Sequence, residues 1–369
     1  MINMKGKITF GSGEFRHRSV HFASVTNGQG AEVVRLSVYA KGGNLAEYVF
    51  SDRHGIPRNI LFEAPWHQFD PDVVKLGDKT FDYYGGDDAR KRVASVGGSS
   101  LCFPTFGPGK MEVTGGLHGE ANIVEWKLVE TTESYFSIEA HLPITGWRVR
   151  RFFGFNPGRS WVKVTTEFEN LDDSPKNVTW AEHMNFGEFA LGSSLELPKG
   201  TKVFNYHKKF HDVHSLFREG GQSIWPLAEG KGGWQIDMST FSVPGYPDMR
   251  QSDFTAQVID PSNPSGWFVL RNERLGIALV VNWPREEAPF LARWIENRAR
   301  TPSPWSGRTQ MMGLEWGRSP WADGVDSAVG QKSHDGNQTY INVAARGSFS
   351  TEFSMRAVAE YDTGDPLNS

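Results

Sequence analysis

A glutamate within an otherwise apolar run is the first candidate for chemistry in this sequence. Residues 311–317 read Met-Met-Gly-Leu-Glu-Trp-Gly and alternate as a β-strand does, with successive side chains on opposite faces. Glu315 therefore shares one face of the expected strand with Gly313 and Gly317. Because glycine inside a strand often marks the close approach of a ligand, the pattern indicates a carboxylate at the floor of a pocket. A bulged edge strand with a solvated glutamate is the alternative.

A histidine in a second strand-like run has a similar setting. In residues 180–187, the same alternation puts His183 on one face with Ala181 and Asn185. Imidazole exchanges protons near neutral pH, although a hydrogen-bonded structural histidine is the alternative. Two strands thus each offer one titratable group among small or polar neighbours. Only the fold can bring His183 and Glu315 together, since they lie far apart in the chain.

Two further side chains are candidates for contact with a ligand. His118 lies in the glycine-flanked segment 115–120, which fits either a site residue or a half-exposed histidine in a tight turn. Trp294, in the run 289–295, could offer an aromatic face to a sugar ring, with core packing as the alternative.

The spacing of His207, His211 and His214 is the only one that resembles a set of metal ligands. The residues around them do not have a helical pattern, and they match neither the Cys/His zinc patterns nor His-Glu-x-x-His. A solvated loop is the favoured interpretation, so no metal site is predicted. Nucleotide and serine-hydrolase chemistries are unsupported as well, because neither a phosphate-cradling glycine motif nor a Gly-x-Ser-x-Gly elbow occurs.

The elements that must position these residues are strands. Short β-like runs separated by turn residues include 32–39, 45–50, 135–141, 149–155 and 161–169. Regular spacing of this kind is typical of an all-β sandwich or barrel. We expect residues 87–92 to form a short helix and residues 198–264 to be irregular. No linker separates two compositions, so residues 1–369 are predicted to form one domain.

Composition and charge exclude several classes of partner. The 369 residues include 40 glycines, 20 prolines and 13% aromatic residues, which favours short strands and tight turns. The formal charge of −4, with both signs interspersed, offers no basic face, so we expect neither nucleic acid nor membrane as a partner. Residues 1–10 have no apolar signal core, and the single cysteine, Cys102, fits a reducing compartment. These features predict a cytoplasmic protein.

Several short motifs, taken in their order along the chain, carry a resemblance to a known family. They are residues 102–107 (Cys-Phe-Pro-Thr-Phe-Gly), 117–121 (Leu-His-Gly-Glu-Ala), 182–183 (Glu-His), 289–294 and 313–315 (Gly-Leu-Glu). In this order they resemble the aldose 1-epimerase (galactose mutarotase) family. The resemblance implies a large antiparallel β-sandwich, a small-molecule sugar as the partner and no cofactor. It also implies the interconversion of the α and β anomers of an aldose.

The resemblance implies roles for individual residues. Glu315 would take the proton from the C1 hydroxyl, and His183 in its protonated form would donate to the ring oxygen. His118, Glu120 and Trp294 would contact the sugar. Burial would raise the pKa of Glu315, while a nearby carboxylate would help to keep His183 protonated.

The resemblance leaves some points open. A family aspartate that holds a sugar hydroxyl corresponds equally well to Asp237, Asp248 or Asp253. Ser99 and Ser100 stand where sugar-phosphate branches of the family have an arginine, which argues against phosphate recognition.

Two other classes of function fit the same fold. One is a carbohydrate-binding protein without turnover, which would not require both an acid and a base. The other is a lyase or an epimerase at another carbon, for which Tyr206 or Tyr246 could serve as the base.

Overall fold

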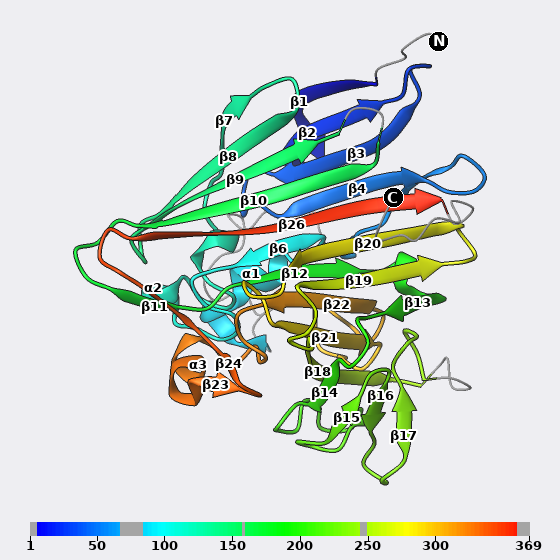
Figure 1. Ribbon diagram of the computed structural model, residues 1–369, viewed down its shortest axis with the longest axis vertical. Helices are drawn as coiled ribbons and strands as arrows, with labels where there is room; N and C mark the ends of the chain where they lie inside the picture. Colours follow the sequence, from blue (N-terminus) through cyan, green and yellow to red (C-terminus); the bar gives the residue numbers. More distant parts are fainter. Residues whose placement is uncertain (1–5, 67–83, 157–158, 244–248, 360–369) are drawn as a thin grey trace.

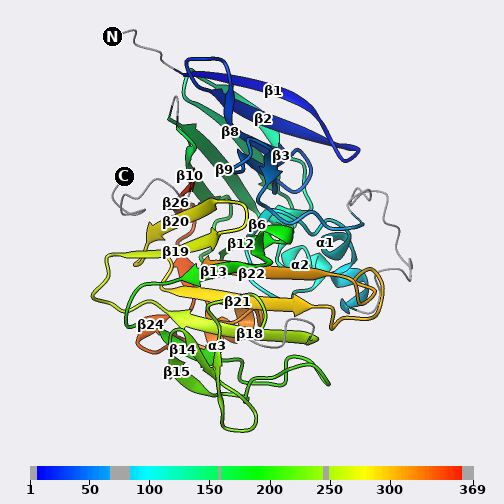
Figure 2. The ribbon, with the colours of Figure 1, turned by 90° about the vertical axis from the view of Figure 1, so that its right-hand side faces the viewer.

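Two large antiparallel sheets form most of the structure, a computed structural model that describes residues 6–66, 84–156, 159–243 and 249–359 (Figures 1 and 2). They confirm the predicted all-β sandwich. The larger sheet has 12 strands. Its spatial order is β1 (Lys7–Phe15), β2 (Arg18–Thr26), β3 (Glu32–Tyr39), β4 (Leu45–Ser51), β6 (Ser99–Cys102), β12 (Ala181–Phe186), β22 (Gln310–Gly317), β21 (Phe290–Asn297), β18 (Gln251–Val258), β14 (Lys202–Asn205) and β15 (Gln222–Ile224), with β5 (Pro57–Asn59) beside β4.

The smaller sheet has eight strands and packs in front of the larger one in the view of Figure 1. Its order is β13 (Ser193–Glu196), β19 (Ser265–Asn272), β20 (Ile277–Pro284), β26 (Ser348–Ala359), β10 (Trp161–Asn170), β9 (Trp147–Phe155), β8 (Tyr135–Leu142) and β7 (Lys127–Thr131). Three short pairs complete the strands: β11 (Lys176–Val178) with β25 (Ile341–Val343), β16 (Leu227–Glu229) with β17 (Gln235–Asp237), and β23 (Ser333–His334) with β24 (Asn337–Gln338).

Helices are few and short. They are α1 (Arg90–Ala94), α2 (Met111–Thr114), α3 (Val325–Gln331) and the single-turn 3-10 segments η2 (Gly86–Asp88), η3 (Glu120–Asn122) and η4 (Glu188–Ala190). Together η2 and α1 confirm the short helix expected over residues 87–92. Within the described ranges, none of the helices has the length and apolar character needed to cross a bilayer.

The main core lies between the two sheets, and the alternation of β22 decides which of its side chains enter it. Met312, Leu314 and Trp316 join the buried cluster between the sheets, as the alternation predicted, while Met311 joins a second cluster on the opposite face. Trp316 stacks on Trp283 of β20, with ring centroids 5.2 Å apart. Figure 2 shows α1 and α2 on that opposite side of the larger sheet, away from the smaller sheet.

The larger sheet extends through a region that we expected to be irregular. Residues 198–264 contain β14 and β18, and β18 pairs along its whole length with β21. The sequence of β18, Gln-Ser-Asp-Phe-Thr-Ala-Gln-Val, is polar, yet all eight residues are buried. Alternation of polarity fails as a signal here, because several of the buried polar side chains form hydrogen bonds within the protein. Asp253, for example, accepts hydrogen bonds from Ser215 and Leu216.

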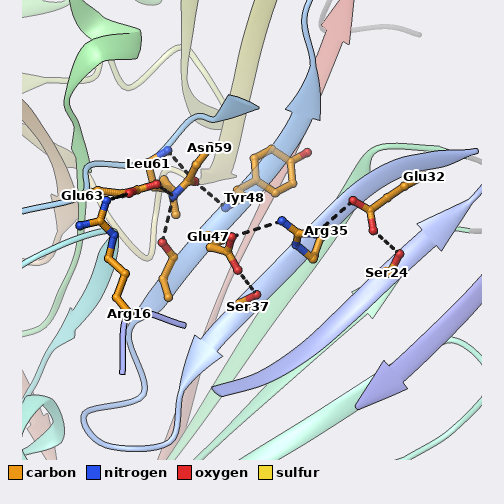
Figure 3. Close-up of polar contacts among 11 residues, drawn as sticks. Arg16, Ser24, Glu32, Arg35, Ser37, Glu47, Tyr48, Asn59, Leu61 and Glu63 are labelled. Atoms are coloured by element: carbon orange, nitrogen blue, oxygen red, sulfur yellow. Dashed lines mark hydrogen bonds and ion pairs between the residues drawn. The ribbon is translucent and has the colours of Figure 1, made fainter. Parts of the chain in front are cut away.

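Polar side chains also tie the first strands of the larger sheet together (Figure 3). Ser24 Oγ donates to Glu32 at 2.6 Å, and Ser37 Oγ donates to Glu47 at 2.6 Å. Arg35 of β3 lies between the two carboxylates, 3.5 Å from that of Glu32 and 3.4 Å from that of Glu47. These contacts compensate the buried carboxylate of Glu47 and link β2, β3 and β4.

A buried ion pair joins β12 to the smaller sheet. Arg151 Nη2 of β9 lies 2.7 Å from Glu182 Oε2, and the two side chains are 0% and 2% exposed. Ser99 Oγ donates to the other carboxylate oxygen of Glu182 at 2.6 Å. The side chain of Glu182 is held toward the smaller sheet. Because successive side chains of a strand point to opposite faces, His183 points to the opposite face of the larger sheet.

Removing one partner of this pair should be costly, because the other charge stays buried without compensation. We expect Arg151→Met to lower the free energy of unfolding by about 3–5 kcal/mol, measured by urea denaturation. Lys163→Met is the control, since it breaks the exposed Lys163–Glu352 pair and should cost less than about 1 kcal/mol. Equal losses in the two variants would show that the buried pair does not secure β12.

Candidate active site

The register between β12 and β22 places the two candidate catalytic residues side by side. His183 lies directly opposite Glu315, just as Asn185 lies opposite Gly313. His183 Nε2 is 3.2 Å from Glu315 Oε1, and the two side chains are 3% and 1% exposed. The two atoms are in contact without the alignment of a hydrogen bond, and neither carboxylate oxygen of Glu315 has a hydrogen-bond partner among the described residues. Two residues far apart in the chain thus form one buried acid–base pair.

The glycines on either side of Glu315 serve different purposes. A Cβ atom on Gly313 would meet Glu315 Oε1 at 2.8 Å and His183 Cε1 at 3.2 Å, so this glycine leaves room for the pair. A Cβ atom on Gly317 would meet the backbone oxygen of Trp180 at 2.2 Å. Gly317 therefore allows the neighbouring chain to approach, and only Gly313 makes space beside the carboxylate.

A cavity of about 310 Å³ opens beside the pair on the face of the larger sheet that turns away from the smaller one. His118, His183 and Glu315 line it together with aromatic side chains. The aromatic members are Tyr84, Phe210, Phe254, Trp294 and Trp305. This volume lies at the lower end of the range for small-molecule sites and is adequate for a monosaccharide.

His118 enters the cavity from the loop before η3. Its backbone is left-handed, with φ at 62°, and its ring centroid is 5.4 Å from that of His183. The N–H of Gly107 donates to His118 Nδ1 at 3.2 Å. Burial and the charge of Arg92 lower the pKa of His118 to about 3. The neutral ring therefore carries its proton on Nε2 and can donate it in a hydrogen bond.

Burial determines the protonation of His183 and Glu315. It raises the pKa of Glu315 to about 8, against a smaller opposing effect of Arg92. Burial, followed by His118 and Arg92, lowers the pKa of His183 well below its ordinary value. The expectation that Glu315 would keep His183 protonated is thus corrected, because desolvation outweighs the attraction between them. Near neutral pH the pair holds one proton, on the carboxyl group, beside a neutral imidazole.

Arg92 is a site residue that the sequence analysis missed. It projects from α1, its exposure is 3%, and its Nη2 donates to Ser100 Oγ at 2.7 Å. Ser100 itself lies opposite His183 in the pairing of β6 with β12. The guanidinium of Arg92 favours the ionised form of Glu315. One arginine in a short charged helix carries no pattern that marks it as a site residue.

Trp294 lines the cavity as well. It is 7% exposed, and its ring centroid lies 6.1 Å from that of His183 and 5.5 Å from that of Trp305. The guanidinium of Arg300 lies 4.7 Å from the ring centroid of Trp294. Arg300, a second residue that the sequence analysis missed, also lines the cavity.

The prediction that Glu120 contacts a ligand is corrected. Its carboxylate is fully buried and accepts hydrogen bonds from Ile144 N and Thr145 N, both at 2.9 Å, and from Thr145 Oγ1 at 2.7 Å. Glu120 therefore holds the turn between β8 and β9. The adjacent backbone places His118 in the cavity, whereas Glu120 two positions later turns into the protein.

The alternative acidic and basic candidates have other partners or positions. Asp253 is hydrogen-bonded within the protein, as described above, and Asp237 lies exposed on β17. The hydroxyl of Tyr206 donates to Asp323, and burial followed by that contact raises the pKa of Tyr206. A phenol with a raised pKa is a poor base at neutral pH. Tyr246 and Asp248 lie outside the described residues.

Of the three histidines in residues 207–214, His211 and His214 are in contact with each other, while His207 contacts Asp323. His207 Nε2 lies 3.4 Å from Asp323 Oδ2, while His211 Nδ1 accepts the backbone N–H of His214 at 3.1 Å. Within the described ranges, no group of three or more His, Cys, Asp or Glu side chains is arranged to hold a metal ion.

Comparison with known proteins supports the fold. Neither protein-family models nor curated protein sequences match the chain. Among solved structures, a Klebsiella pneumoniae protein provisionally named an aldose 1-epimerase has 11% sequence identity and a TM-score of 0.61, over 96% of this chain and 84% of that one. A galactose mutarotase related enzyme from Lactobacillus acidophilus has 11% identity and a TM-score of 0.55, over 96% and 99%. A galactose mutarotase-like protein from Clostridium acetobutylicum has 11% identity and a TM-score of 0.54, over 96% and 99%.

Such likeness at low identity establishes the class of fold. The chain has the galactose mutarotase-like β-sandwich, in agreement with the resemblance seen in its short motifs.

The raised pKa of Glu315 predicts how stability depends on pH. A carboxyl group with a higher pKa in the folded than in the unfolded state holds its proton more tightly when folded, so the unfolding free energy falls as pH rises from about 4.5 to about 8. Glu315→Gln cannot ionise. We therefore expect its stability relative to the wild type to increase over this interval, by at most about 1.4 kcal/mol per pH unit.

Urea denaturation of both proteins at several pH values measures this difference. Glu188→Gln, at an exposed position, is the matched control and should remain parallel to the wild type. If Glu315→Gln also remained parallel to the wild type, the carboxyl group of Glu315 would not have the raised pKa.

Proposed function

We propose that this protein is a mutarotase, which interconverts the α and β anomers of an aldose. The observation that carries the proposal is the contact between His183 and Glu315 at 3.2 Å, beside a cavity walled by aromatic side chains. Its fold, shared with proteins named for this activity, supports the same conclusion. The proposed enzyme uses a free sugar, needs no cofactor or metal, and acts in the cytoplasm, a reducing compartment that suits its single buried thiol, Cys102.

The proposed reaction needs one acid and one base at the same time. One group takes the proton from the C1 hydroxyl while the other donates a proton to the ring oxygen. The C1–O5 bond breaks, the aldehyde rotates about C1–C2, and closure reverses both transfers. A pair that holds a single proton provides both functions, because one member is always the donor when the other is the acceptor.

The assignment of the two roles follows the family resemblance and requires the proton to move within the pair. Near neutral pH the proton rests on Glu315. Its transfer to His183 yields a carboxylate base and an imidazolium acid, the arrangement that the family resemblance implies. The guanidinium of Arg92 stabilises the carboxylate in this state, whereas the same charge disfavours the imidazolium of His183. We propose that Glu315 acts as the base at C1–OH and His183 as the acid at the ring oxygen, with the roles reversed on closure.

The aromatic walls supply the remaining requirement, which is a surface for the sugar ring. Trp294 lies next to His183 and lines the cavity. Sugar rings present flat patches of C–H groups that pack on aromatic faces. A protein that only binds sugar would gain nothing from burying an acid and a base in contact, since burial of titratable groups is costly. This cost favours the enzyme over the binding protein.

Anomer-exchange NMR over a panel of aldoses tests the proposal. We expect the wild type to accelerate exchange of at least one sugar above the buffer rate, and Glu315→Gln or His183→Asn to reduce that acceleration by about 10²–10⁴-fold. His17→Asn and Glu188→Gln make the same changes at exposed positions and should keep the wild-type rate. Exchange at the buffer rate for every sugar would refute the mutarotase proposal. Full activity in both site variants would refute the assignment of the pair.

A further inference from the structure

The cavity offers far more hydrogen-bond donors than acceptors. Its described lining includes the guanidinium groups of Arg92 and Arg300 and the indole groups of Trp294 and Trp305. The two indole N–H groups have no hydrogen-bond partner among the described residues. Among the described lining residues, Glu315 is the only carboxylate, and none is Asp, Asn, Gln, Ser or Thr. A neutral aldose has hydroxyl groups that need acceptors as well as donors. An anionic group needs donors only.

Arg300 is fixed in the wall of the cavity by aromatic rings. Its guanidinium carbon lies 4.7 Å from the ring centroid of Trp294, 5.3 Å from that of Tyr84 and 5.4 Å from that of Trp305. Its Nε lies 3.4 Å from Glu296 Oε2, and the side chain keeps 22% of its exposure. Stacking and this single ion pair hold the plane of the guanidinium in place. A preorganised guanidinium of this kind binds a carboxylate with less loss of entropy than a mobile one.

Arg92 adds a second, deeper set of donors. The side chain is almost fully buried, and its Nε and Nη1 have no hydrogen-bond partner among the described residues. Leaving buried donors without partners is costly, so a ligand that supplies acceptors to them is favoured. Its nearest acidic group in the cavity is Glu315, which is protonated near neutral pH. The empty cavity therefore has an excess of positive charge.

Trp294 lies close to both the proposed catalytic pair and Arg300. Its ring centroid lies 6.1 Å from that of His183 and 4.7 Å from the guanidinium carbon of Arg300. In a pyranose C5 is joined to C1 through the ring oxygen, so a sugar with C1 and the ring oxygen at the pair could direct its C5 substituent toward Arg300.

We infer that the substrate is a hexuronic acid, an aldose whose carboxylate carbon C6 is attached to C5, and that Arg300 binds this carboxylate. The inference rests on the proposed function. A planar carboxylate matches the fork of one guanidinium, with two parallel N–H···O bonds. A phosphate dianion is usually met by several cationic or backbone donors together. No lysine is among the described lining residues, and Arg92 lies at the catalytic end, so one guanidinium remains for the distal group.

The test compares uronic acids with their neutral parents. Anomer-exchange NMR gives kcat/KM for D-glucuronate and D-galacturonate, for D-glucose and D-galactose, and for D-glucose 6-phosphate. We expect at least one uronate to exceed its parent aldose by tenfold or more and to exceed D-glucose 6-phosphate. Arg300→Gln should lower kcat/KM for that uronate by about 10–100-fold, the loss typical of a charge-assisted hydrogen bond, with a smaller effect on the neutral parent. Arg300→Lys should restore part of the uronate rate.

Controls separate binding from folding. Arg274→Gln, at an exposed position, should leave all rates unchanged, and thermal unfolding should show that Arg300→Gln is folded. If neutral aldoses had kcat/KM values equal to those of the uronates, the inference would be overturned. An equal loss of kcat/KM for both classes in Arg300→Gln would overturn it as well. A clear preference for D-glucose 6-phosphate would overturn the choice of carboxylate.

Direct binding distinguishes failure of this inference from failure of the proposed function. If no sugar exchange is accelerated, the mutarotase proposal fails, and calorimetric binding of D-glucuronate and D-glucose then decides the inference alone. Binding of D-glucuronate at least tenfold tighter than D-glucose, and lost in Arg300→Gln, would support it. Equal or weaker binding of D-glucuronate would overturn it.

Discussion

The register in which β12 pairs with β22 is the constraint on which the site depends. Side chains alternate along a strand, so a slip of one residue would exchange the two faces of β12 and turn His183 into the core between the sheets. Two interior contacts oppose such a slip. Glu182 is paired with Arg151 of the smaller sheet, and Trp316 is stacked on Trp283. Packing between the sheets thus determines the positions of His183 and Glu315 on the opposite face of the larger sheet.

The candidate site lowers the stability of the folded protein. His183, Glu315 and Arg92 are buried together, and each has side-chain atoms without hydrogen-bond partners among the described residues. Such groups cost free energy unless a ligand satisfies them. The surrounding sandwich compensates with a continuous apolar core and fully paired central strands. A rigid scaffold with a destabilised site is the combination expected when groups are held ready for a reaction.

The sequence alone was sufficient for the fold class and for the candidate pair. Alternation in the strand around Glu315 placed Glu315 and its neighbouring glycines on one face, and Met312, Leu314 and Trp316 on the other face pack in the core between the sheets. Alternation did not predict β18, because a strand with many buried polar residues has a sequence that resembles a loop. Glu120 was assigned to the wrong role, because a motif does not show which way a side chain turns after a left-handed residue.

The site residues that the sequence did not predict were missed for one physical reason. Arg92 and Arg300 lie on a short helix and in a loop, where no periodicity constrains the direction of a side chain. Their positions depend on tertiary packing against Ser100 and against the aromatic walls. The protonation of the pair also depends on burial, which a sequence pattern does not quantify. Sequence analysis could therefore point to Glu315 and His183 as candidates but could not determine which of them holds the proton.

The most direct test of this account is an NMR titration of Glu315 and His183 in the same protein. Carboxyl carbons labelled with 13C and ring nitrogens labelled with 15N would be assigned with Glu315→Gln and His183→Asn. The account predicts a Glu315 carboxyl signal with a midpoint near 8 and a His183 ring that stays neutral at pH 6. A Glu315 midpoint near its ordinary value of 4.5, or a His183 ring that becomes charged near 6.5, would contradict the claim that the two buried groups hold a single proton on the carboxyl.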